Sequence, residues 1–216
     1  MSDLYTKENM QNLAQLKKLA PEQVKAFNDF NADVLKDGAL SNKEKEIIAV
    51  AITHVTQCPY CIESHTKSAK KAGATLEELC EAIFVTAAVE AGGTVTHSTH
   101  VHNAKNKEAS DVLYARSNLK SLGQLGKFAS DGFKGYQAFS AVATKSGQLS
   151  SKIKEIIAVA VANTIQCPYC IDVHTKNADK QGATGEELAE AIMVASAVRA
   201  GGAYAHMANM IQCYQE

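Results

Sequence analysis

The residues of this sequence that are best suited to chemistry are two pairs of cysteines, each with a histidine and a glutamate at a fixed spacing. Each pair lies in a Cys-Pro-Tyr-Cys motif, with a histidine four residues after the second cysteine and a glutamate twelve residues before the first. Two cysteines three apart at a helix start can form a disulfide, and the helix N-terminus stabilises a thiolate. A histidine, with an unperturbed pKa of about 6.5, can take or give the thiol proton. The candidate catalytic residues are Glu46, Cys58, Cys61 and His65, and again Glu155, Cys167, Cys170 and His174.

The segments around the first pair read as two helices joined by a short turn. Ser41 and Glu44 form a capping-box pattern that opens the first helix. Proline is favoured at the first helical position, so Cys58-Pro59 makes Cys58 the N-cap of the second helix, which ends at Gly73. In an antiparallel hairpin that turns near residue 57, the glutamate lies about 15 Å along one arm and the histidine about 10 Å along the other.

The difference between these two distances along the hairpin is small enough for the side chains of Glu46 and His65 to meet. It predicts a proton relay from Glu46 through His65 to Cys61, with Cys58 as the other half of a disulfide. Alternatively, Glu46 is a solvated carboxylate that the helix dipole favours by itself, and Lys45 and Lys154 beside the two glutamates read as surface charges.

Further helices are expected on both sides of this hairpin. Pro21 begins an upstream helix, and Thr75 with Glu78 forms a second capping box. The helix that follows is predicted to face the core with a stripe at helical spacing. That stripe comprises Leu76, Leu79, Cys80, Ile83, Phe84 and Ala87. We expect Gly92-Gly93 to break this helix before a last one near residues 97–104. No segment reads as a strand, and each half is expected to hold five or six helices.

The chain is a tandem duplication. Adding 109 to a residue number maps the first half onto the second, and 34 of 53 positions between Lys45 and His97 are identical without a gap. The polar stretch near residues 105–112 marks the boundary, so we predict one unit at residues 1–108 and a second at residues 109–216. A repeat this long is a duplicated domain rather than a solenoid unit.

Composition is that of an ordinary globular protein. Of the 216 residues, 46% are apolar and 21% are charged, and the formal net charge is −1. This argues against disorder, a nucleic-acid surface and a patch for anionic membranes. The polar N-terminus does not read as a signal peptide, and no apolar run suggests a membrane helix. We therefore expect a cytoplasmic protein whose six cysteines are free of structural disulfides.

The Glu-x11-Cys-x2-Cys-x3-His pattern, present twice in an Ala-rich helical chain, resembles the AhpD-like alkylhydroperoxidases of the carboxymuconolactone decarboxylase superfamily. The resemblance implies an all-α fold of two tandem AhpD-like helical bundles and thiol-dependent reduction of hydroperoxides. It places the peroxidatic role on Cys61 and Cys170, the resolving role on Cys58 and Cys167, and a proton relay on the Glu and His. It further implies a lipoylated, thioredoxin-like or small-thiol reductant, no cofactor and no metal, and a homo-oligomer, either a trimer or a pseudo-hexamer.

Other readings of the same residues remain open. The superfamily also contains lactone decarboxylases, so a lyase with idle cysteines is one alternative. Two cysteines, one histidine and one glutamate are also residue types that bind zinc, so a zinc-stabilised binding protein is another alternative. We expect Cys80 to be inert core filler. His97 and its counterpart His206 are expected to serve packing between helices, with the alternative that they line the same pocket. His97, His100 and His102 form a His-x2-His-x-His cluster with the ligand types of a metal site.

Overall fold

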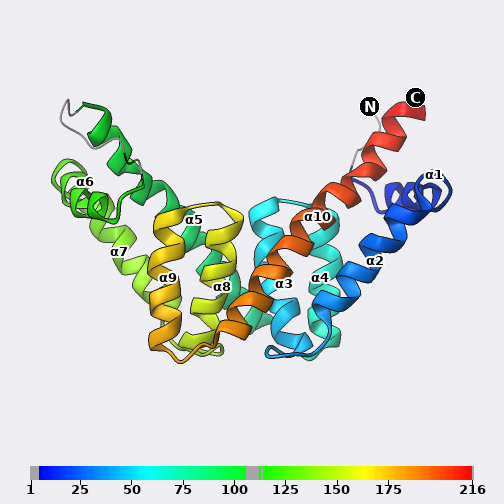
Figure 1. Ribbon diagram of the computed structural model, residues 1–216, viewed down its shortest axis with the longest axis horizontal. Helices are drawn as coiled ribbons and strands as arrows, with labels where there is room; N and C mark the ends of the chain where they lie inside the picture. Colours follow the sequence, from blue (N-terminus) through cyan, green and yellow to red (C-terminus); the bar gives the residue numbers. More distant parts are fainter. Residues whose placement is uncertain (1–4, 106–111, 113, 216) are drawn as a thin grey trace.

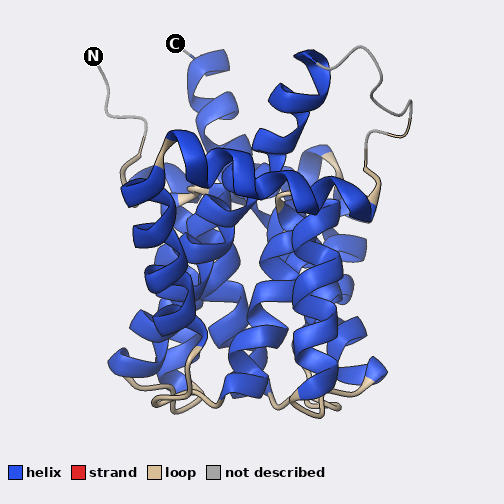
Figure 2. Cartoon of the chain, turned by 90° about the vertical axis from the view of Figure 1, so that its left-hand side faces the viewer, coloured by secondary structure: helices blue, strands red, loops and turns tan. Residues whose placement is uncertain are grey.

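The structure, a computed structural model, describes residues 5–105, 112 and 114–215, without the side chains of residues 102 and 103. Every regular element in these ranges is a helix (Figure 2), which confirms the all-α prediction. The first repeat forms η1 (Glu8–Gln15), α1 (Leu16–Leu19), α2 (Pro21–Leu35), α3 (Asn42–Thr56), α4 (Pro59–Lys71) and α5 (Leu76–Lys105). The second forms η2 (Arg116–Ser121), α6 (Leu122–Phe128), α7 (Ser130–Thr144), α8 (Ser151–Thr164), α9 (Pro168–Lys180) and α10 (Gly185–Gln215). The boundary at residues 108 and 109 lies outside the described residues and stays a prediction.

The two repeats exchange their long helices. In Figure 1 the chain forms two lobes, and α10 rises from beside α8 into the lobe that holds α1 to α4. There it packs on α3, α4, α2 and η1, while α5 packs in the same way on α8, α9, α7 and η2. Both described ends of the chain therefore lie at the same arm (Figure 1). Each lobe is complete only with a helix from the other repeat.

The core lies where α3 and α8 meet. These helices are apolar almost all round, and Ile48, Val50, Ile157 and Val161 on them are buried in one continuous cluster. A helix that is apolar on every face must be covered on every face. The hairpin partners α4 and α9 and the two exchanged helices provide that cover. Glu46 and Glu155, near the start of these helices, are therefore carried on buried elements of the fold.

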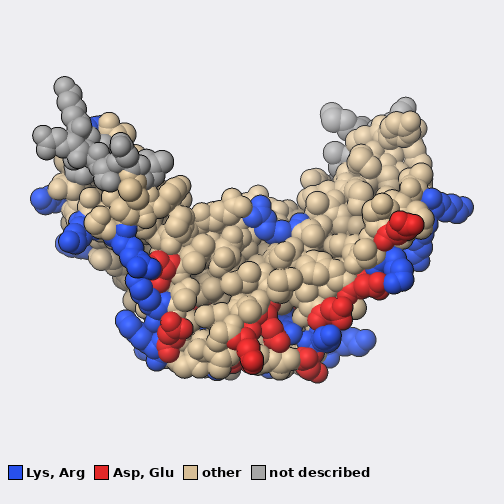
Figure 3. Space-filling model, viewed as in Figure 1, with Lys and Arg blue, Asp and Glu red and all other residues tan. Residues whose placement is uncertain are grey.

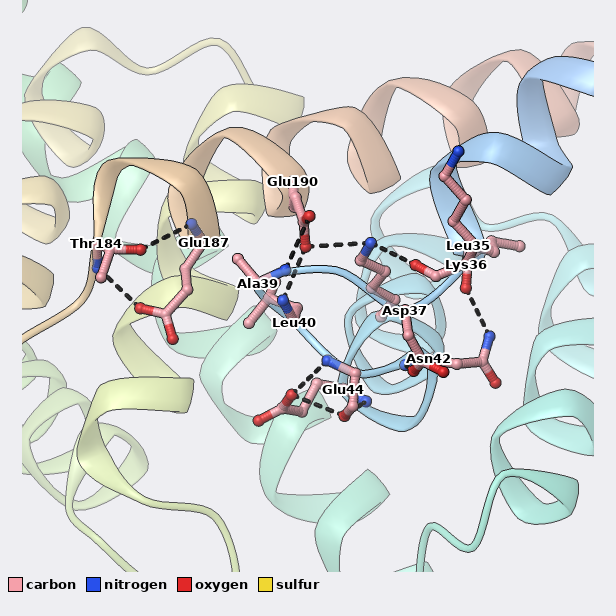
Figure 4. A network of polar contacts seen from close by, with 12 residues as sticks. Leu35, Lys36, Asp37, Ala39, Leu40, Asn42, Glu44, Thr184, Glu187 and Glu190 are labelled. Carbon is pink, nitrogen blue, oxygen red and sulfur yellow. Dashed lines mark hydrogen bonds and ion pairs between the residues drawn. The ribbon is translucent and has the colours of Figure 1, made fainter.

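A glutamate from the opposite repeat binds the loop that precedes each central helix, α3 or α8. We call this contact, made by Glu190 or Glu81, the clamp. Glu190 of α10 accepts hydrogen bonds from the backbone N–H groups of Ala39 (3.0 Å) and Leu40 (2.8 Å), as Figure 4 shows. It also pairs with Lys45 at 3.1 Å, whose side chain is only 3% exposed. Glu81 of α5 repeats this arrangement at the loop before α8 and pairs with Lys154 at 3.0 Å. The prediction that the two lysines are surface charges is therefore wrong, because each is buried against a carboxylate from the other repeat.

The predicted break at Gly92-Gly93 is also wrong, since α5 runs without interruption from Leu76 to Lys105. The glycines permit close packing instead of ending the helix. A Cβ on Gly92 would stand 2.7 Å from the Tyr136 hydroxyl oxygen, and one on Gly93 would stand 2.9 Å from Cδ1 of Ile165. Glycine inside a helix costs about 1 kcal/mol relative to alanine, and here that cost accompanies a close approach of neighbouring helices.

The core-facing stripe of α5 is shifted from its predicted position. Leu79, Ala82, Val85 and Val89 are buried, whereas several residues of the predicted stripe lie at the surface. The exposed ones include Leu76, Cys80 and Phe84. Cys80 is thus an exposed free thiol rather than core filler. Small residues at positions 82 and 85 let α5 approach α3 and α8 closely, and helical spacing alone does not distinguish between two apolar stripes of similar period.

One stretch of α5, Leu76–Val101, is long and apolar enough to cross a membrane by length and composition. It carries four glutamates, including the clamp residue Glu81. Its buried face packs in the core against α3 and α8. The apolar character of this helix is accounted for by packing inside the protein.

Candidate functional site

The first cysteine pair occupies the first turn of α4, as the proline predicts. Cys58 is the N-cap, and its sulfur accepts a hydrogen bond from the backbone N–H of Cys61 at 3.3 Å. The two cysteines are joined in a disulfide, with their Cα atoms 5.3 Å apart. Both are buried. The turn before them places Gln57 in the left-handed region (φ 54°), which brings α4 back along α3.

The second pair has the same local geometry but holds two free thiols. Cys167 is the N-cap of α9 and accepts a hydrogen bond from the backbone N–H of Cys170 at 3.4 Å. A hydrogen bond from the Cys170 thiol lowers the pKa of Cys167 to about 5, despite burial. Thr96 and His97 add to this lowering. The same thiol–thiol bond and burial raise the pKa of Cys170. At neutral pH the second pair therefore holds one thiolate and one thiol, with the thiolate at the cap.

A glutamate–histidine pair joins the two helices of each hairpin. Nδ1 of His65 lies 2.8 Å from Oε2 of Glu46, and His174 lies at the same distance from Glu155. The glutamates are almost fully buried at 7% and 9% side-chain exposure. Since an ionised carboxylate only accepts, Nδ1–H donates to it and Nε2 remains available for a proton. The predicted contact between the two helices of each hairpin is confirmed.

The opposite repeat completes each cysteine site. The Thr96 hydroxyl of α5 lies 3.5 Å from the sulfur of Cys167 and 4.0 Å from that of Cys170. His97 lines a cavity together with Cys167, and its buried Nε2 has no hydrogen-bond partner. The sequence interpretation gave His97 a packing role. Its retention as His206 was the one signal that could have placed it at the site.

The corresponding cover of the first pair comes from α10. Ala205 packs in a small cluster with Cys58, Cys61 and Tyr60. His206 lies against the Tyr60 ring, with the centroids 6.3 Å apart. An alanine thus stands at the first site where Thr96 stands at the second. The two sites share their motif but differ in what touches the sulfurs.

The tyrosine between the cysteines is hydrogen-bonded at both sites, to η2 of its own repeat in the case of Tyr169 and to α10 of the other repeat in the case of Tyr60. The Tyr169 hydroxyl accepts a hydrogen bond from Asn118 at 2.8 Å, and the Tyr60 hydroxyl accepts one from Asn209 at 3.3 Å. Around Tyr169 the rings of His97 and His100 lie 6.1 and 5.9 Å away, centroid to centroid. These tyrosines anchor the start of α4 and α9 to their surroundings.

A cavity opens at each site, on different sides. The one at the first site, about 300 Å³, reaches Cys61 and the Glu46–His65 pair between α2, α4 and α10. The one at the second site, about 330 Å³, reaches Cys167 from the side of His97 and Glu90. Burial raises the pKa of Glu90. Small molecules can therefore approach both pairs.

The described residues give no support to a metal centre. Among them, no group of three or more His, Cys, Asp or Glu side chains is arranged to hold a metal ion. The side chain of His102, the third histidine of the predicted cluster, lies outside the described part of the chain.

The model of the carboxymuconolactone decarboxylase family matches the chain twice, at residues 21–104 and 131–212. The chain belongs to the carboxymuconolactone decarboxylase family. The two matches together cover most of the sequence and fall one in each repeat, so the protein is a tandem member of this family with an AhpD-like arrangement.

Two relatives of this chain are named as uncharacterized proteins. Uncharacterized protein 4 in the cox locus of Paracoccus denitrificans is 49% identical over 73 residues, which is 34% of this chain and 66% of that protein. An uncharacterized protein of Haemophilus influenzae is 40% identical over 95 residues, 44% of this chain and 84% of that protein. Both are matched by less than half of the chain, in keeping with its duplication.

A solved structure of a family member has the same fold. It comes from Burkholderia xenovorans LB400 and is named as a candidate gamma-carboxymuconolactone decarboxylase subunit. The TM-score is 0.68 at 24% identity, over 94% of this chain and 90% of that one. At this identity the likeness concerns the fold alone.

Proposed function

We propose that this protein is a thiol-dependent peroxidase whose two Cys-x2-Cys pairs cycle between dithiol and disulfide. One observation carries the proposal. In the second pair an acidic thiol, Cys167 with its pKa lowered to about 5, stands beside a protonated partner thiol, Cys170. The first pair has the same backbone geometry and is closed as a disulfide. The same fold therefore accommodates both the dithiol state and the disulfide state of a redox cycle.

The reaction begins at the thiolate. Cys167 attacks the outer oxygen of a hydroperoxide, the O–O bond breaks, and the sulfur becomes a sulfenic acid while the alkoxide takes a proton to leave as an alcohol. The Cys170 sulfur then attacks the sulfenic sulfur, which releases water and forms the disulfide. A dithiol reductant restores both thiols by exchange and is itself oxidised to a disulfide.

The thiolate at Cys167 follows the helix-cap position, whereas the resemblance assigns the peroxidatic role to Cys170. Because the N-cap sulfur accepts both the thiol and the backbone hydrogen bonds, we take Cys167 as the nucleophile. The glutamate–histidine pairs serve as proton relays, with Glu155 holding His174 in the orientation that leaves Nε2 free.

The partners belong to the same proposal. A lipoylated or thioredoxin-like protein, or a small thiol, supplies the electrons. We place the protein in the cytoplasm, because the exposed Cys80 and Cys213 are free thiols and a reducing compartment keeps such thiols unpaired. We further propose a homo-oligomer, a trimer or pseudo-hexamer, whose mass light scattering would measure.

A lyase acting on a lactone is the second candidate. The family name and the name of the Burkholderia protein favour it. In that case His65 and His174 would act as acid and base, and the cysteines would be idle. Replacing all four motif cysteines by serine separates the two functions. The peroxidase proposal expects peroxide consumption with a dithiol to fall to the uncatalysed rate, whereas a lyase would keep its turnover of a lactone substrate.

A further inference from the structure

Most of the lining surface of the cavity at the first site is apolar, and Glu46, Ser64 and His65 also border it. Met10, Leu13 and Phe27 lie on one side and Tyr204 of α10 on another, with Cys61 at its base. The rings of Phe27 and Tyr204 stack with their centroids 4.4 Å apart. Its volume of about 300 Å³ is at the small end of the range for ligand pockets. It is therefore shaped for a compact apolar group next to a sulfur.

Three residues at or beside this wall of the first-site cavity are replaced by other residue types in the second repeat. Tyr136 replaces Phe27, Thr144 replaces Leu35, and Val95 replaces Tyr204 under the 109-residue offset. The pKa of Tyr136 is raised by burial and by the negative charge of the nearby Cys167–Cys170 pair, which locates this ring beside the second pair.

The added hydroxyl of Tyr136 occupies space beside Gly92 of α5. A Cβ on Gly92 of α5 would stand 2.7 Å from the Tyr136 oxygen, whereas one on the equivalent Gly201 would stand 3.9 Å from the Phe27 ring. The oxygen thus fills space that remains open at the first site. In addition, the hydroxyl of Thr96 faces the second pair where the methyl group of Ala205 faces the first.

We propose that the two sites have diverged in substrate: the first accepts hydroperoxides with an apolar organic group, and the second is restricted to small polar oxidants such as hydrogen peroxide. This inference rests on the proposed peroxidase function. At the first site the organic group lies against Phe27 and Tyr204, and the O–O bond lies at the sulfur of Cys61, the cysteine that this cavity reaches. At the second site Tyr136 and Thr96 offer hydroxyl groups, and the cavity of about 330 Å³ is bordered by Glu90, Thr94 and His97 instead of by Phe and Tyr rings.

The test uses the reduced full-length chain and an amount of oxidant too small to oxidise both pairs. Cumene hydroperoxide and hydrogen peroxide are compared, the reaction is quenched with N-ethylmaleimide, and peptide mapping measures the Cys58–Cys61 and Cys167–Cys170 disulfides. The ratio of first-site to second-site disulfide is expected to be at least about tenfold higher with cumene hydroperoxide, since apolar contacts of this size discriminate by such factors. Equal ratios with both oxidants would overturn the inference.

Reciprocal variants at positions 27 and 136 test whether these residues cause the difference in oxidant preference between the two sites. F27Y is expected to lower the preference of the first site for cumene hydroperoxide, and Y136F to raise that of the second. F84Y, which adds the same hydroxyl to an exposed ring that borders neither cavity, is the matched control and should leave the ratio unchanged. An unchanged ratio in both F27Y and Y136F would overturn the inference while leaving the peroxidase function intact. Absence of any disulfide at either pair with either oxidant would overturn the peroxidase function itself.

Discussion

At the scale of single residues, the acidity of Cys167 depends on donors from two parts of the chain. Its own helix supplies the N–H and the thiol of Cys170, and α5 of the other repeat supplies the Thr96 hydroxyl. A lowered pKa means that the thiolate is present above about pH 5 and is lost as the pH falls through that value. An ordinary thiol, with a pKa of about 8.5, would still be gaining thiolate at pH 8.

Alkylation of Cys167 by iodoacetamide should therefore have a midpoint near pH 5 and be nearly constant from pH 6.5 to 8. The T96V variant removes one hydroxyl donor, so we expect the midpoint to rise by about 1 pH unit. Mass spectrometry of the Cys167 peptide measures this rate. T94V is the control, because the Thr94 hydroxyl donates to the Glu90 carbonyl and not to sulfur. A wild-type midpoint above pH 8 would contradict the assignment of the thiolate.

The sequence predicted the residues of the motif better than their environment. The Glu46–His65 contact followed from the lengths of two helices, which are local quantities. Thr96 was missed because it lies 71 residues before the sulfur it touches, on a helix whose partner could not be inferred from spacing. Internal retention of His97 as His206 was the only trace of this long-range contact in the sequence.

At the scale of elements, α5 and α10 are long helices whose glycines set how closely their neighbours approach. Their capping signals were read correctly: the Thr75 and Glu78 bonds that open α5 are present at 3.1 and 2.8 Å. The break at Gly92 was read wrongly, since a glycine pair signals either an end or a close contact. Only the three-dimensional position of Tyr136 decides between the two.

The G92A and G201A variants test this difference at equivalent positions. G92A places a methyl group against the Tyr136 hydroxyl, and we expect a loss of about 1–3 kcal/mol in the free energy of unfolding. G201A meets only the Phe27 ring at an ordinary 3.9 Å and should gain up to about 1 kcal/mol from helix propensity. Urea denaturation followed by circular dichroism measures both. Equal effects of the two variants would refute the packing role of Gly92.

At the scale of the whole molecule, the exchanged helices make the two repeats one cooperative unit. The lobes are joined by α5 and α10, and the clamps of Glu81 and Glu190 cross between repeats. Charged side chains gather along the lower, convex edge of the molecule, and the hollow between the two arms is mostly uncharged in this view (Figure 3). The sequence predicted two domains in tandem, and it could not predict that they share helices, because a repeat has the same pattern whether it packs on itself or on its copy.

Neutralising one clamp should destabilise both lobes together. E190Q leaves the buried Lys45 without its carboxylate, and we expect a loss of about 2–3 kcal/mol, below the value for a fully buried pair since Glu190 is partly exposed. Calorimetry should show a single transition at a lower temperature. E186Q, at an exposed glutamate of the same helix, is the control. Two separate transitions in E190Q would show that the repeats unfold independently.

The central claim is that both cysteine pairs are redox-active. The most direct measurement is a count of free thiols in fully reduced protein before and after brief exposure to a small excess of hydroperoxide. The account predicts six thiols falling to two, with peptide mapping identifying Cys80 and Cys213 as the survivors. Retention of all six thiols would contradict it and leave the lyase as the remaining function.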